Sequence, residues 1–144
     1  MLGITAVVLL IGELVHGQDQ GTPAWLFTRS LQVGDAAFQV AIADSADERM
    51  RGLSGVPTMG SNEGLYFVYP TPRPLLFWMK DMRFSLDIVW IDERQRVVDI
   101  MEDVTPETFP TIFSSPRIAQ YALEINAGRA RETGIEIGDT VILY

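Results

Sequence analysis

The sequence predicts a mainly β fold: a small β-barrel-like or sandwich domain with two short helices. Short runs in which apolar and polar residues alternate recur along the chain, and turns rich in Gly, Pro and Asp separate them. Only two stretches carry helix start and stop signals, and both are short. Seven or more short strands with so few helices are typical of a barrel or sandwich, rather than of an alternating helix–strand sheet.

The N-terminal segment differs in kind from the rest of the chain. Leu2 to Gly12 is apolar apart from Thr5. This run is too short to cross ~30 Å of hydrocarbon as a helix, but its length suits a secretory signal. Val15-His16-Gly17 offers a small-x-small cleavage pattern, although no basic residue precedes the apolar run. We expect residues 1–17 to be a signal peptide or short anchor, 18–25 a linker, and 26–144 one β-rich domain. Export to the periplasm or exterior follows, with an uncleaved anchor or a buried cytosolic helix as alternatives.

The first part of the domain predicts a β-hairpin followed by a short helix. Residues 31–33 and 38–42 alternate apolar and polar side chains on either side of a Gly-Asp turn. Ser45 and Glu48 stand three apart in a capping box, which begins a helix that we expect to end near Gly52. A loop rich in Gly, Pro, Ser and Asn follows the helix.

Two aromatic and branched runs, 64–69 and 75–80, predict the next two strands. Pro70, Pro72 and Pro74 lie between the runs. Because proline cannot donate to a strand ladder, we expect this segment to be a connection outside the sheet.

The last part of the domain predicts a second hairpin, another strand, a short helix and a final strand. The strands are expected at residues 86–91, 96–101, 118–125 and 140–144. Asn126 is expected to cap a helix that runs through Thr133, with Gly134 as its C-terminal stop. The Gly138-Asp139 pair then predicts a turn in which the aspartate bonds local backbone.

Composition narrows the chemistry that the chain can perform. A formal net charge of -8 provides no basic field for phosphates, so we expect no nucleic-acid partner. The chain has no cysteine, and its one histidine, His16, lies in the expected signal. A mature domain without thiolate or imidazole excludes Ser-His-Asp hydrolysis and zinc held by His or Cys. A Ser-Lys pair, a carboxylate pair or oxygen ligands for a hard cation remain, and we expect no metal and no cofactor.

Five sequence runs stand out in order along the chain: Gly64–Val68, Phe77–Asp81, Leu86–Asp92, Ala122–Gly128 and Gly134–Asp139. In that order and spacing they resemble the bacterial and archaeal family called domain of unknown function 192. The resemblance covers about residues 31–141 and implies a compact β-barrel-like domain, often behind a signal or lipid anchor, with no known reaction. The chain departs from the family pattern at Ser54, Asp81 and Ser85, where Met, Asn and Pro are usual.

Lys80, Asp87 and Glu124 each interrupt an apolar strand, which predicts one polar cluster. Lys80 is the only lysine and shares parity with Trp78, so its stem is expected to lie on apolar surface. It is structural if it pairs with Asp87 or Glu124, and functional if it holds a carboxylate ligand or acts as a base; a solvated surface lysine is the third interpretation. Asp87 either caps a nearby backbone turn or serves as a ligand contact or catalytic acid. The same alternatives apply to Glu124.

Trp78 and Ser115 complete the set of candidate ligand-binding residues. Trp78 and its aromatic neighbours form either a surface for a sugar or peptide, or part of the core. Those neighbours are Phe77, Tyr66 and Tyr69. Ser115 lies in a Ser-Ser-Pro loop that either supplies a hydroxyl beside Lys80 or only turns the chain.

Two functional hypotheses follow from these residues. The first is a non-enzymatic ligand-binding or interaction module of the cell envelope, with a small molecule, sugar or peptide as its partner and no membrane span in the mature domain. The second is a hydrolase of envelope polymer that uses Asp87 and Glu124 as acid and base, or Ser115 activated by Lys80. A structural domain whose motif residues serve folding is the third interpretation.

Overall fold

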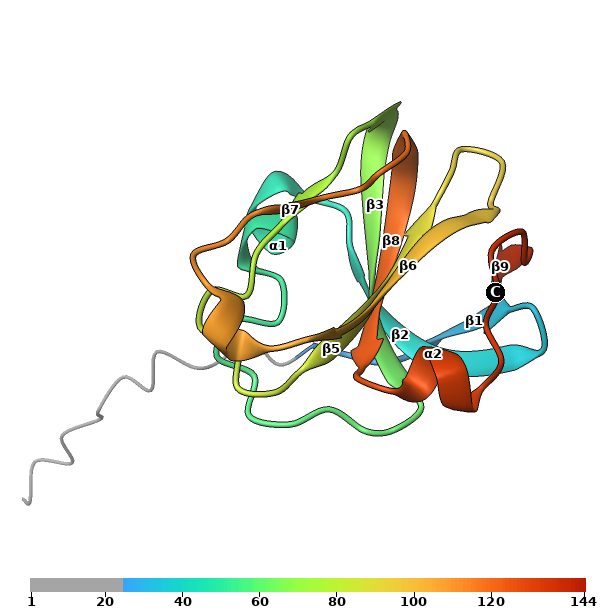
Figure 1. Cartoon of the computed structure of the whole chain (residues 1–144). Coiled ribbons are helices and arrows are strands. Elements are labelled where there is room, and N and C mark those ends of the chain that lie inside the picture. The colour runs from blue at the N-terminus through green and yellow to red at the C-terminus, as the bar shows by residue number, and fades with distance from the viewer. Residues whose placement is uncertain (1–24) are drawn as a thin grey trace, which may run out of the picture.

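Figure 1 shows the computed structural model of the chain, which describes residues 25–144. The expected signal or anchor, and all of the expected linker except Trp25, lie outside the described residues. The strands of the described part are β1 (Arg29–Val33), β2 (Ala36–Ala43), β3 (Glu63–Arg73), β4 (Leu76–Phe77), β5 (Leu86–Ile91), β6 (Val97–Val104), β7 (Phe113–Ser114), β8 (Ala119–Asn126) and β9 (Val141–Leu143). The helices are α1 (Ala46–Arg51), α2 (Arg129–Glu132) and the single 3-10 turn η1 (Pro106–Thr108).

Seven strands form one curled sheet in the order β6-β5-β8-β3-β2-β1-β9, and β4 and β7 form a small second sheet. Only β2 and β3 pair in parallel; the other neighbours in the large sheet are antiparallel. The two ends of the sheet approach each other through a bridge between Arg96 and Thr140 and a 3.0 Å hydrogen bond from Val97 N–H to Asp139 O. The result is a half-barrel, so the predicted mainly β, barrel-like fold with two short helices is confirmed (Figure 1).

The central strands are apolar on both faces because the curled sheet has a core on each side. The inner cluster joins residues from both ends of the sheet, among them Leu31, Phe38, Val89, Val97, Leu123 and Val141. The outer cluster packs the other face against the segments that follow α1 and β3, and includes Leu53, Met59, Phe67, Phe77, Met79, Ile88 and Trp90. All six residues of β5 are therefore buried, which explains why its sequence shows no simple alternation.

Helix α1 forms as its sequence predicts. The Ser45 hydroxyl accepts a hydrogen bond from Glu48 N–H, and the Glu48 carboxylate accepts from Ser45 N–H at 3.0 Å. Gly52 ends the helix with a φ of 51°, a conformation that costs glycine little. Trp25 packs at this end and donates from Nε1 to Gly52 O at 3.0 Å. No helix in the described part of the chain is long and apolar enough to cross a membrane.

The segment from 70 to 80 differs from its prediction in two ways. The strand expected to end before Pro70 continues as β3 to Arg73, although its pairing with β8 is irregular between Val68 and Arg73, where the prolines are exposed. The strand expected over residues 75–80 shrinks to the two-residue β4. Prolines are tolerated here because the irregular, exposed stretch demands no regular ladder hydrogen bonds from them.

The helix start at the C-terminal end also differs. Helix α2 begins after Gly128, whose φ is 86°, and not after Asn126. The Asn126 side chain instead donates to Met59 O and Gly60 O, at 2.9 and 3.2 Å. These bonds hold the loop after α1 against the end of β8. The expected stop at Gly134 and the turn before β9 are confirmed, and Asp139 accepts from Glu136 N–H at 2.8 Å.

Candidate ligand-binding site

Asp87 is a buried structural carboxylate on the inner face of the sheet. The residue is 0% exposed. Its Oδ1 accepts from Asp103 N–H and its Oδ2 from Ala130 N–H, both at 2.9 Å. Asp87 therefore ties the end of β6 and the start of α2 to β5. This geometry matches the backbone-capping interpretation of the residue.

Glu124 lies on the opposite face of the sheet from Asp87. Glu124 is paired with Ile88 of the outer cluster, whereas Asp87 is paired with Ile125 of the inner cluster. Glu124 Oε2 is buried and has no hydrogen-bond partner among the described residues. Burial raises the pKa of this carboxyl to about 8, so it is largely protonated at pH 7. Two carboxyl groups buried on opposite faces cannot act together on one substrate.

Ser115 holds backbone rather than facing an open site. The residue is buried, and its Oγ accepts from Leu75 N–H at 2.9 Å. Its own N–H donates to Leu75 O at 2.9 Å. The paired bonds fasten the Ser-Ser-Pro segment to the residue before β4. Among the described residues, this hydroxyl makes no hydrogen bond with Lys80, the arrangement that one of the two interpretations required.

Lys80 is exposed, and its ammonium lies over an aromatic ring. The Lys80 Nζ is 5.6 Å from the centroid of the Trp78 ring. The ion pairs of residues 25–144 do not include Lys80, so the expected pair with Asp87 or Glu124 is wrong. The predicted single polar cluster is also wrong, because Asp87 and Glu124 are buried on opposite faces of the sheet while Lys80 is exposed. Of the five candidates, the structure brings together only Trp78 and Lys80.

Trp78 and Lys80 line an open groove of about 370 Å³ beside α1. Trp78 is 39% exposed, and its ring meets Phe109 edge-on at a centroid distance of 5.8 Å. The other groove residues are Asp47, Met50, Arg51, Ser54 and Asp81. An exposed indole with two cations and two carboxylates around it provides both an apolar face and polar groups for an organic ligand.

The segment that carries these residues is fixed to the loop after α1. Ser54 Oγ donates to Lys80 O at 2.8 Å, and Gly55 N–H donates to Asp81 O at 2.9 Å. Asp81 has a φ of 55°, a left-handed conformation that Asp and Asn adopt more readily than other side chains. Phe77 and Met79 point into the outer cluster, so Trp78 and Lys80 point out of it.

Two further depressions continue the groove in both directions. On the β4 side, an apolar depression of about 230 Å³ shares Met50 and Trp78 with the groove and adds Leu76, Phe77 and Ile112. At the other end, an open depression of about 530 Å³ shares Ser54 and Asp81 and adds Gly55, Met82 and Arg83. We call the three together the trough.

The aromatic neighbours of Trp78 pack in or against the core, which matches the core interpretation rather than the ligand-surface interpretation. Tyr66 is buried, stacks on Tyr121 at 5.7 Å, and donates from its hydroxyl to Gln95 Oε1 at 2.9 Å. Phe77 packs edge-on against both Phe67 and Trp90. Tyr69 is half-buried beneath the Arg49 guanidinium. Among the described residues, no group of three carboxylate or imidazole side chains could hold a metal ion.

The sequence matches one family model over almost the whole described domain. The model is DUF192, described as Uncharacterized ACR, COG1430, and it matches residues 29–143. The chain belongs to the DUF192 family. The resemblance inferred from the five sequence runs is thus confirmed.

Relatives of this DUF192 domain occur in archaea and bacteria. A UPF0127 protein of Thermococcus kodakarensis is 31% identical over 105 residues, and one of Thermococcus gammatolerans is 32% identical over 104. These matches cover 72% and 71% of the chain, and the chain spans only 63% and 64% of the two archaeal proteins.

Two solved structures share the fold of the DUF192 domain. A protein of unknown function from Novosphingobium aromaticivorans DSM 12444 has a TM-score of 0.75 and 28% identity, covering 78% of this chain and 83% of that one. A protein from Sinorhizobium meliloti 1021, named a "putative transcription regulator", also has a TM-score of 0.75, with 24% identity over 81% of this chain and 95% of that one. The second likeness establishes the fold alone.

Sequence reasoning found the centre of the trough in this DUF192 domain but missed both ends. Leu76 shares parity with Trp78 and Lys80, and this alternation is the signal that could have placed it on the outward side. Ile112 and Met50 come from other parts of the chain, and Arg83 follows Lys80 by three residues without a pattern that marks it. No pattern in the sequence indicated that they would meet the same surface.

Proposed function

We propose that this domain is a non-enzymatic ligand-binding module of the cell envelope and that the trough around Trp78 and Lys80 is its binding surface. The observation that carries the proposal is the exposed Trp78 ring, which lies in a groove with the only lysine of the chain. Folded domains cover most large aromatic side chains, and an exposed indole flanked by charges is typical of recognition surfaces.

The geometry supports binding over hydrolysis. A glycosidase mechanism needs two carboxyl groups about 5–9.5 Å apart across an open cleft. Asp87 and Glu124 are instead buried on opposite faces of the sheet. A Ser-Lys mechanism needs an accessible hydroxyl within reach of the amine. Ser115 is buried and engaged with backbone, while Lys80 is exposed over Trp78.

A role on nucleic acid receives no support from the charges of the chain. The name of the Sinorhizobium meliloti protein concerns that protein, and the likeness to it is one of fold. Proteins that bind DNA neutralise phosphates with a concentrated basic surface. This chain carries 11 Lys and Arg against 19 Asp and Glu. A small organic molecule, a sugar or a peptide suits such a protein better.

Location in the envelope is part of the proposal and rests on the apolar run from Leu2 to Gly12. The full chain and a variant without residues 2–17 should be expressed with a C-terminal tag in a bacterial host and fractionated. We expect the full chain outside the cytoplasm or on the membrane, and the shortened chain in the cytoplasm. Recovery of the full chain solely from the cytoplasm would contradict the location.

Amide chemical shifts test the binding surface directly. We would titrate the labelled protein with indole-3-acetate, chitotriose and the dipeptide Leu-Glu, and expect at least one probe to shift amides of residues 47–54 and 76–83. Trp78→Ala and Lys80→Ala should each weaken that probe at least tenfold. Ile137→Ser is the matched control because Ile137 is equally an exposed apolar residue, 64% exposed, outside the trough. Absence of shifts in both segments with every probe would sink the proposal.

A further inference from the structure

We infer that the ligand of the trough is an extended peptide, with an apolar side chain lying between Leu76 and Ile112 and a carboxylate near Lys80 and Arg83. The inference rests on the proposed function and names the class of its ligand. Four properties of the trough carry it: its continuity, an apolar end, two cations without ion pairs in the rest of the trough, and the spacing of the side chains along it.

The continuity of the trough favours an elongated ligand. The apolar depression and the central groove share Met50 and Trp78, and the central groove and the largest depression share Ser54 and Asp81. One side of all three is the single segment from Leu76 to Arg83. A compact ligand would occupy one depression, whereas a chain-like ligand can follow the segment through all three.

The end near β4 is apolar and open to solvent. Met50, Leu76 and Ile112 line the depression and are 71%, 61% and 60% exposed. Trp78 and Phe109, which touch edge-on, extend this surface. A contiguous group of exposed apolar side chains, rimmed by polar residues, marks an interaction site more often than isolated ones do. An aliphatic or aromatic side chain is the chemical match.

The charged part of the trough is its central groove together with the depression at Arg83. The charged lining residues are three cations, Arg51, Lys80 and Arg83, and two carboxylates, Asp47 and Asp81. The lining thus has a net charge of +1 in a chain with a net charge of -8. Neither Lys80 nor Arg83 takes part in an ion pair within residues 25–144. Their donors are available to a carboxylate of another molecule, and complementary charge favours such a ligand in this part of the trough.

The spacing along the trough suits a peptide. Leu76, Trp78 and Lys80 point outward at every second position, while Phe77 and Met79 point into the core. An extended peptide repeats its side chains with the same period of two residues. An acyl chain binds best in an enclosed apolar channel, whereas the centre of this trough is open and charged. A sugar would gain little from the exposed aliphatic side chains of the β4 end.

Fluorescence anisotropy with dye-labelled octapeptides tests the ligand class. The reference probe carries Leu at its second position, Glu at its sixth and seventh, and Gly and Ser elsewhere. One matched probe replaces Leu by Ser and another replaces both Glu by Lys, and each is made in both chain directions. We expect the reference peptide to bind at least tenfold more tightly than either matched probe in at least one direction. Equal affinity of the three peptides, or no binding of any, would overturn the inference.

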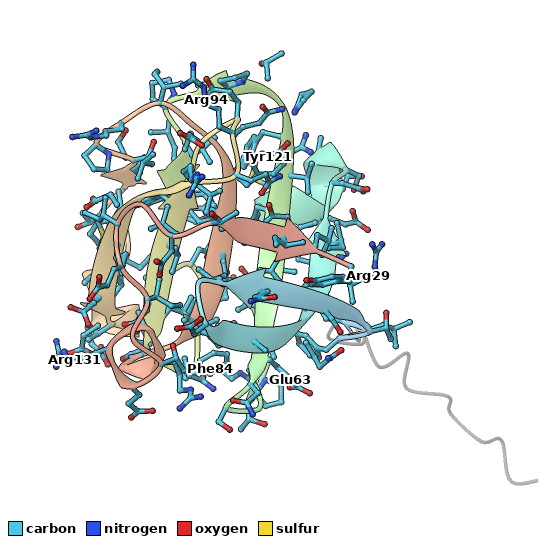
Figure 2. The ribbon with its side chains drawn as sticks, turned by 90° about the vertical axis from the view of Figure 1, so that its right-hand side faces the viewer. Arg29, Glu63, Phe84, Arg94, Tyr121 and Arg131 are labelled. Carbon is cyan, nitrogen blue, oxygen red and sulfur yellow. The ribbon has the colours of Figure 1, made fainter. Side chains whose placement is uncertain are left out.

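Surface variants then assign the two ends of the peptide. Leu76→Ser should weaken the reference peptide at least tenfold and leave the Ser-substituted peptide unchanged. Arg83→Glu should weaken the reference peptide and strengthen the Lys-substituted peptide, because the charges are exchanged. Arg94→Glu is the control: Arg94 lies in the β5–β6 turn, at the far end of the molecule from Phe84, the neighbour of Arg83 (Figure 2). The assignment would be contradicted if Arg83→Glu and Arg94→Glu both lost binding of the reference peptide to the same extent, or if neither lost it.

The outcome separates this inference from the proposed function. If indole-3-acetate or chitotriose shifts the trough amides while no octapeptide is selected by its Leu or Glu residues, the trough binds a ligand that is not a peptide. The inference then fails and the binding function stands. If no probe of any kind perturbs the trough, both fail together. Because Leu76 and Arg83 are exposed, thermal unfolding of both variants is expected to stay within a few degrees of the wild type.

Discussion

Asp87 and Lys80 each interrupt an apolar stretch with a charge, and the structure gives them opposite surroundings. Asp87 is buried on the inner face, and both of its oxygens accept backbone hydrogen bonds. Lys80 lies in the trough, with its ammonium over Trp78 and no ion pair among the described residues. The comparison teaches that charge alone does not mark a site. A polar group that is hydrogen-bonded inside the domain supports the fold. A polar group that is exposed to solvent is available to a ligand.

The largest effect is expected at Asp87. Asp87→Ala removes both acceptors and leaves the N–H groups of Asp103 and Ala130 without them, so we expect the free energy of unfolding to fall by ~3–5 kcal/mol. Urea unfolding at pH 7 measures it. Asp87→Asn, which retains one acceptor oxygen, should lose less. A loss below 1 kcal/mol for the alanine variant would show that water replaces the carboxylate and would remove the contrast with Lys80.

Glu124 gives the next largest effect and depends on pH. Its carboxyl is buried like that of Asp87, but Oε2 has no partner in the described part of the chain, and burial raises its pKa to about 8 from 4.5. Because the folded pKa lies above the unfolded one, the stability from the protonated form is complete below pH 4.5 and is lost as pH rises through 8. Between pH 4.5 and 7 the loss is ~3 kcal/mol, at 1.36 kcal/mol for each pH unit.

Glu124→Met removes this dependence while keeping the length of the side chain. We expect the variant to be more stable than the wild type by ~3 kcal/mol at pH 7, with a smaller gain at pH 4.5. Urea unfolding across this pH range measures the difference. Glu136→Met, at an exposed position, serves as the control and should leave the pH profile unchanged. A gain at Glu124 that is the same at every pH would contradict the raised pKa.

Ser115 provides a smaller test of the same principle. Ser115→Ala leaves the buried N–H of Leu75 without its acceptor, and we expect a loss of ~1–2 kcal/mol in the free energy of unfolding. Ser114→Ala is the neighbouring control, because Ser114 is exposed. Since Leu75 precedes β4, amide exchange of residues 75–77 should also accelerate in the Ser115 variant. If the alanine variant unfolds like the wild type, the hydroxyl is not part of the scaffold.

Local patterns predicted the elements of the fold, and long-range contacts decided the site. The capping box at Ser45, the hairpin turns and the runs of β5 and β8 are signals carried by neighbouring residues, and each produced the expected element. The partners of Asp87 come from β6 and α2, 16 and 43 residues away. No local pattern shows which backbone N–H groups will reach a carboxylate. The sequence therefore could not show that Asp87 is buried and hydrogen-bonded while Lys80 lies exposed in the trough.

The two faces of the central strands raise the same difficulty. Asp87 and Glu124 both lie in strands whose two faces are apolar, because the half-barrel has an inner and an outer core. Parity within one strand therefore could not assign either carboxyl to a face. Pairing Ile88 with Glu124 and Ile125 with Asp87 settles it, and that register is a property of the sheet.

The smallest effect on stability is expected at Lys80, and it sharpens the comparison most. Lys80→Met keeps the aliphatic stem and removes only the exposed cation–π contact with Trp78, worth ~0.5–1 kcal/mol. The free energy of unfolding in urea should therefore barely change, in contrast to Asp87→Ala. The reference octapeptide should nevertheless lose most of its affinity for the variant. A loss of stability above 2 kcal/mol would mean that the ammonium supports the fold as Asp87 does. Lys80 would then cease to be a free donor, and the trough would depend on Arg51 and Arg83 for its positive charge.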